Sequence, residues 1–175
     1  TIDQSLRFER DDDDFLARTP ASEGNRKIWT FSVWVKRTQL GSEQHVMAVT
    51  SSGGSESFLR FDATTDVIRV SEQTASYSSV LYVTDAVYRD TSAWYHIVLA
   101  CDTTDTTPAD RFKLFVNGER VTSFSTQTNA TDSADTRWND TYEHVIGAAT
   151  GAHSNRLQAY LAEFNFIDGQ QLDAD

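Results

Sequence analysis

The chain has 175 residues, with 15 Lys and Arg against 26 Asp and Glu, and its formal net charge is −11 at pH 7. Nucleic acids and anionic membrane surfaces both require clustered basic residues, so this charge argues against either as a partner. No apolar run is long enough for a transmembrane helix, and the single Cys101 excludes an internal disulfide. We expect residues 1–175 to form one domain, and to be one module of a longer protein.

The first half of the chain contains short apolar runs separated by polar turns. Between residues 28 and 35, Trp29 and Phe31 alternate with Ser32 and Trp34, which is typical of a β-strand with two different faces. The four consecutive carboxylates of residues 11–14 repel one another and predict a solvated turn, and residues 51–55 predict a flexible turn. We predict strands at residues 5–8, 28–35, 45–50, 58–61, 67–70 and 80–83.

The second half contains the strongest strand signals. Residues 97–101 are apolar on both faces, as in a strand covered on both sides. Residues 112–116 form another strand and end at Asn117-Gly118, a pair that tolerates the positive φ angles of a tight hairpin turn, after which an alternating run resumes at Glu119. Residues 125–140 predict a long polar loop, and residues 142–146 and 160–167 predict two more strands. About ten to twelve short strands without helical periodicity indicate an all-β sandwich or barrel.

Four blocks together resemble the laminin-G-like modules of the concanavalin A-like superfamily. They are residues 29–37 (WTFSVWVKR), 92–99 (SAWYHIVL), 113–118 (KLFVNG) and 160–168 (YLAEFNFID). The amino-acid sequences of the second and fourth blocks are similar to those of a subgroup of marine bacteriophage tail and structural proteins. The resemblance implies a two-sheet antiparallel β-sandwich, a concanavalin A-like jelly roll, on a virion fibre or appendage. The members of this superfamily bind glycans or proteins, cleave glycans or build structure, so the fold does not select the function.

Glycoside hydrolysis requires two carboxylates on opposite sides of the scissile bond. Glucanases of this superfamily carry Glu, Asp and Glu at near-alternate positions of one strand, whereas here Glu163 is followed by Asn165 and then by Ile167 and Asp168. We therefore predict that the domain is not an enzyme, and that Glu163 is an ordinary polar residue near a sheet edge or an ion-pair partner.

Other catalytic and metal patterns are also missing from the sequence. It has no Gly-x-Ser-x-Gly elbow and no Gly-rich phosphate loop. His45, His96, His144 and His153 do not follow zinc-site spacing, and we expect His96 to be a hydrogen-bonded sheet residue.

Calcium is the one cofactor that the sequence makes a candidate, because Ca²⁺ prefers carboxylate, amide and carbonyl oxygens. One loop offers Asp102, Asp105 and Asp110, and another offers Asp132 and Asp135 near Asn139 and Asp140. The alternative is that Asp and Asn occur here because they favour turns. Residues 11–14 form a third acidic cluster, to which the same two interpretations, calcium site or turn, apply.

Sugar binding requires an exposed ring and nearby amides or carboxylates. Trp138, Asn139 and Asp140 combine these groups in a long loop, and long loops are often functional. The alternative is a tryptophan that folds back over the edge of its own sandwich, while Trp29, Trp34 and Trp94 are predicted to be core residues.

The resulting hypothesis is a non-enzymatic attachment module of a virion, a fibre, tail or capsid decoration, that contacts host-surface carbohydrate through its rim loops. The alternatives are a purely architectural virion subunit that contacts other virion proteins, or a cell-surface adhesion module. We expect a virion or extracellular location, no nucleic-acid partner, no membrane insertion, and self-association as a further candidate interaction.

Overall fold

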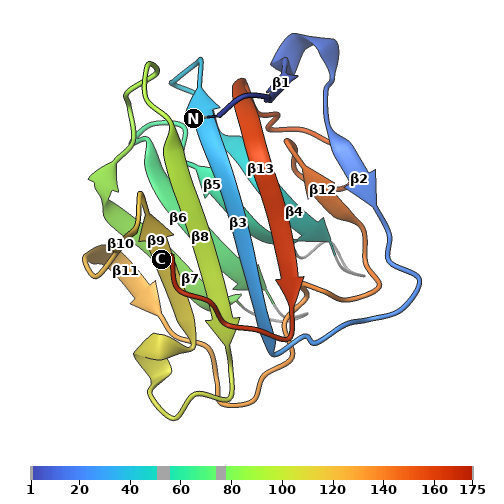
Figure 1. Ribbon diagram of the computed structural model, residues 1–175, viewed down its shortest axis with the longest axis vertical. Helices are drawn as coiled ribbons and strands as arrows, with labels where there is room; N and C mark the ends of the chain where they lie inside the picture. Colours follow the sequence, from blue (N-terminus) through green and yellow to red (C-terminus); the bar gives the residue numbers. More distant parts are fainter. Residues whose placement is uncertain (1, 51–55, 74–77, 175) are drawn as a thin grey trace.

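The computed structural model describes residues 2–50, 56–73 and 78–174, which form two antiparallel sheets packed face to face (Figure 1). This confirms the predicted all-β sandwich. In the described part of the chain the only helical segments are two short 3₁₀ turns, Arg10–Asp12 and Pro108–Asp110. No helix among these residues is long and apolar enough to cross a membrane.

The sheet nearer the viewer in Figure 1 is called the front sheet. In spatial order it contains β1 (Leu6–Phe8), β13 (Ala159–Asp168), β3 (Ile28–Arg37), β8 (Tyr95–Asp102), β9 (Phe112–Val116) and β10 (Glu119–Arg120). The back sheet contains β11 (Phe124–Thr128), β7 (Ser78–Val87), β6 (Val67–Gln73), β5 (Glu56–Phe61), β4 (Gln44–Thr50), β12 (His144–Ile146) and β2 (Leu16–Arg18).

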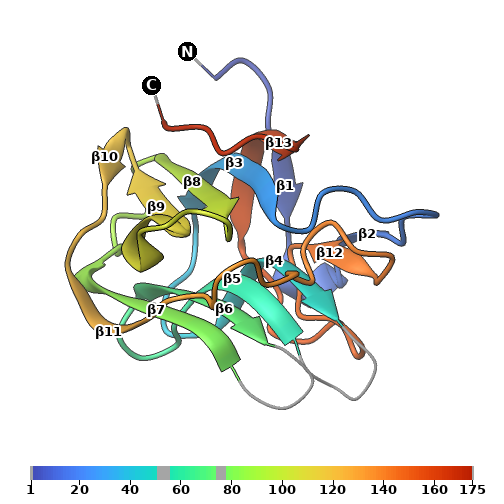
Figure 2. The ribbon, with the colours of Figure 1, turned by 90° about the horizontal axis from the view of Figure 1, so that it is seen from below.

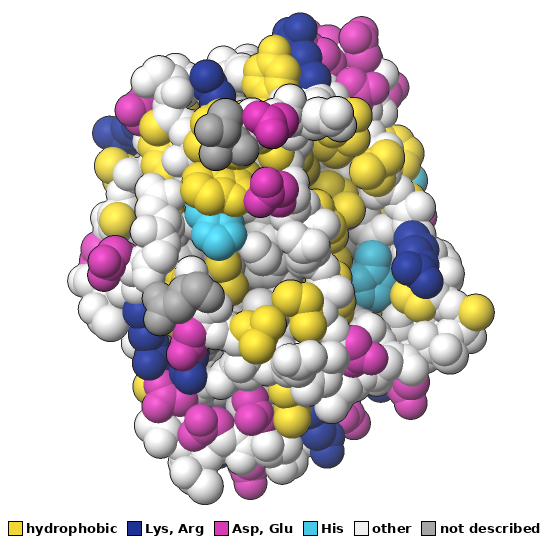
Figure 3. Space-filling model, in the orientation of Figure 1, with side chains coloured by type: hydrophobic (Ala, Val, Ile, Leu, Met, Phe, Trp, Pro, Cys, Tyr) yellow, Lys and Arg dark blue, Asp and Glu magenta, His cyan; other side chains and the backbone are white. Residues whose placement is uncertain are grey.

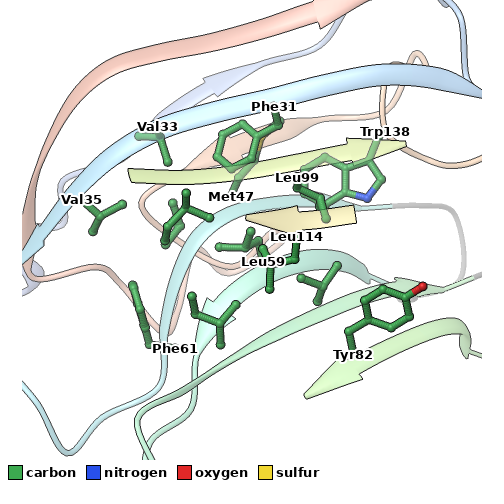
Figure 4. Packing of buried hydrophobic residues seen from close by; sticks show 14 of the residues in the cluster. Phe31, Val33, Val35, Met47, Leu59, Phe61, Tyr82, Leu99, Leu114 and Trp138 are labelled. Atoms are coloured by element: carbon green, nitrogen blue, oxygen red, sulfur yellow. The ribbon is translucent and has the colours of Figure 1, made fainter. Parts of the chain in front are cut away.

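Side-chain alternation along β3 divides the front sheet into an inner and an outer face. Trp29, Phe31 and Val33 are fully buried between the sheets, whereas Ser32 and Trp34 on the opposite face are half-buried. Figure 4 shows the inner side chains of β3 meeting those of the back-sheet strands in one core. Burial of this apolar surface is the main stabilising contribution to the sandwich.

The predicted hairpin after β9 is confirmed. Asn117 and Gly118 have φ angles of 54° and 85°, and β10 pairs back on β9. The alternating run predicted beyond Glu119 is shorter than expected, because β10 ends at Arg120 and the chain then passes to the back sheet as β11. The turn predicted at residues 51–55 lies outside the described residues.

Two strands have no counterpart in the predictions. β11 begins the segment predicted to be a loop, and β2 follows the acidic turn. Both are edge strands whose side chains are mostly exposed, so backbone pairing with β7 and β12 maintains them without an apolar alternation. A strand of this kind is difficult to predict from the hydrophobic pattern of the sequence.

Candidate functional site

The outer face of the front sheet carries a stacked pair of rings. Trp34 of β3 is directly opposite His96 of β8, and the two rings are nearly parallel, with centroids 4.7 Å apart and an interplanar angle of 20°. Both side chains are half-buried, so each ring retains a surface that solvent reaches. Trp34 was predicted to be a core residue, but the alternation of β3 places it on the face opposite to Trp29.

Hydrogen bonds fix the orientation of the histidine. His96 Nε2 and Ser32 Oγ are 3.0 Å apart and share a hydrogen bond whose direction depends on the imidazole tautomer. The backbone N–H of His96 donates to Asn117 Oδ1 at 2.8 Å. Burial lowers the pKa of His96, and the opposing influence of the Glu163 carboxylate is smaller. His96 is therefore a neutral, oriented support for the indole at neutral pH, as expected for a hydrogen-bonded sheet residue.

Glu163 lies beside this pair because β13 contains a β-bulge. The pairing of β13 with β3 shifts between Ala162, which is opposite Trp34, and Asn165, which is opposite Ser32. Glu163 lies within this shift with a φ angle of 48°, and its side chain is exposed. Bulges commonly redirect a side chain next to a functional site. We call Trp34, His96, Ser32 and Glu163 the face patch.

The segments leading to the two termini run over the same outer face (Figures 1 and 2). The C-terminal segment is held by Thr30, whose hydroxyl donates to Gln170 O and accepts from Leu172 N, both at 2.8 Å. Lys113 and Asp173 approach to 3.9 Å further along this segment. Figure 3 shows a histidine bordered by hydrophobic and acidic side chains in the middle of the face that remains open.

The face patch combines an aromatic surface with three kinds of polar group. A half-exposed indole can stack on the apolar face of a sugar ring, while a carboxylate and a hydroxyl can form hydrogen bonds with the sugar hydroxyls. The next outward residue of β13 after Glu163 is Asn165, an amide that cannot act as the second carboxylate of a glycosidase pair.

Trp138 is not available for the stacking role predicted for it. Its ring is fully buried and packs on Trp29, with centroids 5.3 Å apart, and on Phe31, at 6.5 Å. The burial contradicts the expectation of an exposed ring and supports the alternative, a loop tryptophan that closes its own sandwich. The physical reason is the large apolar surface of the indole, which the neighbouring rings of β3 remove from water.

The two neighbours of Trp138 are also engaged within the protein. Asp140 is buried, pairs with Arg26 at 2.9 Å and accepts a hydrogen bond from the Thr141 backbone N–H. Asn139 has a φ angle of 67° and its side-chain amide donates to Asp168 Oδ1 at 2.7 Å. Asn139 nevertheless lines a surface hollow, and it is the one member of the predicted trio that a ligand could reach from outside.

The predicted calcium ligands do not come together. No group of three or more His, Cys, Asp or Glu side chains that could hold a metal ion occurs within residues 2–50, 56–73 and 78–174. Asp102 and Asp105 cap their own turns by accepting from the backbone N–H of Thr104 and Thr107 at 2.9 and 2.7 Å. The other three are paired with cations: Asp110 with Arg120, Asp132 with Arg111 at 3.6 Å, and Asp135 with Lys27 at 3.9 Å. The donor set therefore fits turns and ion pairs and does not fit Ca²⁺.

Two carboxylates of the acidic run at residues 11–14 are likewise engaged within the protein. The run ends the first 3₁₀ turn, Asp14 Oδ2 accepts from Glu9 N at 3.1 Å, and Asp13 pairs with Arg156 at 3.0 Å. These contacts account for Asp13 and Asp14 without a bound ion.

The chain belongs to the concanavalin A-like lectin/glucanases superfamily, whose Laminin_G_3 family model matches residues 11–174. None of the curated proteins compared with the chain matches it. The resemblance predicted from the four sequence blocks is confirmed at the level of this superfamily, and the link to marine bacteriophages stays a prediction.

Solved structures from different organisms share the fold. Domains LG4-5 of the mouse laminin α1 chain superimpose with a TM-score of 0.67 at 14% identity, covering 97% of this chain and 43% of that one. Full-length tailspike protein 2 of an Escherichia coli O157:H7 bacteriophage gives 0.66 at 13% identity, covering 95% and 23%. A putative carbohydrate binding protein from Bacteroides ovatus gives 0.65 at 15% identity, covering 94% and 43%. The chain thus spans less than half of each of these three proteins.

Proposed function

We propose that this domain is a carbohydrate-binding module that binds a saccharide on the face patch without cleaving it. The observation that carries the proposal is the Trp34–His96 stack, held on an open sheet face beside Ser32 and Glu163. Aromatic rings accompanied by a few oriented polar groups are typical of ligand sites. The family and the fold shared with a putative carbohydrate binding protein support the same ligand class.

The location of the site differs from the one predicted from the sequence. We place the site on the sheet face and not in the rim loop around Trp138. The ring of Trp34 has an accessible surface, whereas the ring of Trp138 is buried. The absence of hydrolysis is part of the proposal, and it is supported by the amide at Asn165 where glucanases of this superfamily have their second acidic residue.

We further propose that the module acts outside the cell, on a virion or another surface, and that its partner is a host-surface glycan. The support comes from the resemblance of the sequence blocks to phage structural proteins and from the fold shared with a phage tailspike. The net charge of −11 is compatible with a neutral glycan as the ligand.

The experiment is a glycan array with the isolated domain, repeated with Trp34→Ala and with Phe15→Ala. Phe15 also stacks on a histidine, His153, with centroids 4.0 Å apart, but it is not part of the face patch, so it is a matched control. We expect Trp34→Ala to lose at least tenfold in affinity for the bound glycan and Phe15→Ala to keep it. Equal binding by wild type and Trp34→Ala would reject the face patch, and release of sugar from a bound glycan would reject the non-catalytic role.

A further inference from the structure

The sandwich has an open edge between β13 of the front sheet and β12 and β2 of the back sheet. Two adjoining hollows of about 400 and 320 Å³ follow this edge and share Leu16, Ile146 and Phe164. We call them together the edge groove. Figure 3 shows hydrophobic side chains along the hollow to the right of the front sheet. The remaining lining residues that matter here are Leu6, Met47, Ala162, Glu163, Phe166 and Asp168.

The rims of the edge groove expose apolar side chains to water. Leu6 of β1 and Leu16 of β2 are 51% and 50% exposed, which makes them the two most exposed large hydrophobic residues in the described part of the chain. Phe164 and Phe166, from the inner side of β13, form part of the wall. Apolar surface gathered in a groove, in contrast to single scattered residues, indicates a binding site.

The edge groove is continuous with the face patch through the bulge in β13. Ala162 is opposite Trp34 in the sheet and also lines the groove. Glu163 belongs to the face patch and lines the groove, and its charge acts on His96. The next residue, Phe164, contacts the core ring of Phe31 with centroids 5.0 Å apart. One ligand can therefore occupy both surfaces by crossing Glu163.

The dimensions and chemistry of the edge groove identify the second part of that ligand. From Glu163 to Asp168 the wall extends roughly 17 Å, at about 3.3 Å per strand residue. At the far end Asn139 N donates to His144 Nε2 at 3.1 Å, His144 Nδ1 bonds to Tyr142 O at 2.8 Å, and Asp168 accepts from Asn25 and Asn139. These polar groups satisfy one another and do not require a ligand. The remaining wall is mostly apolar, with Leu6, Leu16, Met47, Ile146, Phe164 and Phe166, and such a surface fits a hydrocarbon chain better than a second sugar ring.

We infer that the ligand is a saccharide that carries an alkyl or acyl chain, with the sugar on the face patch and the chain in the edge groove. This inference rests on the proposed function, because it adds a substituent to the same saccharide. The gain in affinity comes from removing the chain and the groove walls from water.

The test compares n-octyl and methyl β-D-glucoside, both below the micelle concentration, by ¹⁵N–¹H NMR titration of the isolated domain. We expect the octyl glycoside to shift the amide signals of Leu16, Ile146 and Phe164 and to bind at least tenfold more tightly than the methyl glycoside. Leu16→Arg should remove this gain. Val87→Arg should keep it, because Val87 is 49% exposed on β7 and does not line the edge groove.

Three outcomes overturn the inference. They are equal affinity for the two glycosides, octyl-induced shifts that leave the signals of Leu16, Ile146 and Phe164 unchanged, or a concentration-dependent dimer in sedimentation. The dimer counts against the inference if Leu16→Arg abolishes it, since the groove would then hold a second copy of the chain. A failure of the proposed function alone gives a different result. The glycan array then shows no binding, and Trp34→Ala has the same affinity as the wild type. The octyl glycoside still shifts the amide signals of the edge groove, and Leu16→Arg still abolishes these shifts.

Discussion

The indole of Trp34 lies against the imidazole of His96, with 4.7 Å between ring centroids, although the two residues belong to different strands. His96 is in turn bonded to Ser32 and to Asn117. The histidine thus acts as a positioning residue that holds the indole on the sheet face.

This relationship predicts different effects of two substitutions at His96. His96→Ala removes the ring that supports Trp34, and we expect glycan affinity to fall about two- to tenfold, in line with 0.5–1.5 kcal/mol for an aromatic pair. His96→Phe keeps a ring in place and should restore most of that loss. Isothermal titration with the glycan selected by the array measures both. Equal affinities of the two variants would show that the stack does not position Trp34.

Trp138 and Trp34 should respond in opposite ways to truncation. Trp138→Ala removes a fully buried ring, so we expect the free energy of unfolding to decrease by about 3–5 kcal/mol. Trp34→Ala removes a half-exposed ring and should cost clearly less stability while it lowers glycan affinity at least tenfold. Urea unfolding of the two variants measures the difference, and a larger loss for Trp34→Ala would contradict the assignment of core and site.

His45 should make the fold sensitive to acid. Burial, assisted by the nearby Arg60, lowers the pKa of this histidine from 6.5 to about 3, so its contacts with Glu43 and Glu56 are not ion pairs at neutral pH. As the pH falls below 6.5 the unfolded chain takes up a proton that the folded chain does not bind until about pH 3. The native state should therefore lose roughly 1.4 kcal/mol per pH unit within this interval from this group.

The control for this effect is His45→Gln, which has no titrating ring. Urea unfolding at several pH values between 7 and 4 should give a shallower decrease of stability with acid for the variant than for the wild type. Parallel curves would show that His45 does not contribute.

Removal of calcium should not affect the protein. The five candidate aspartates bind their own turns or neighbouring cations. We therefore expect the same melting temperature with an excess of chelator and with about 5 mM calcium, a concentration above the dissociation constants of about 0.1–1 mM of weak extracellular sites. A bound ion would stabilise only the folded state and raise the melting temperature. A rise with calcium that disappears in Asp102→Asn would establish a site that the present arrangement does not contain.

Gly147 precedes the loop after β12 and is expected to tolerate no side chain. Its φ angle is 86°, and a Cβ atom there would lie 2.5 Å from Phe8 Cδ1. Gly41 has a similar φ angle of 78° with nothing within 4 Å of the added atom, so Gly41→Ala reports the backbone strain alone. We expect Gly147→Ala to lower the melting temperature by more than Gly41→Ala, and equal shifts would show that Phe8 moves aside at little cost.

The sequence by itself determined the fold class, because the alternation of Trp29 and Phe31 with Ser32 and Trp34 and the Asn117-Gly118 turn are local features that depend only on neighbouring residues. The same alternation put Trp34 on the face of the strand opposite to Trp29 and Phe31, although Trp34 was predicted to be a core residue. Edge strands such as β2 left no such pattern, since backbone pairing alone maintains them.

Only the tertiary structure decided where the site lies. Whether the loop ring of Trp138 is exposed depends on whether Trp29 and Phe31 are within its reach, and no local rule supplies that information. The approach of Trp34, His96 and Glu163 depends on the register of three strands and on one bulge, so it follows from pairings between residues that are distant in the chain.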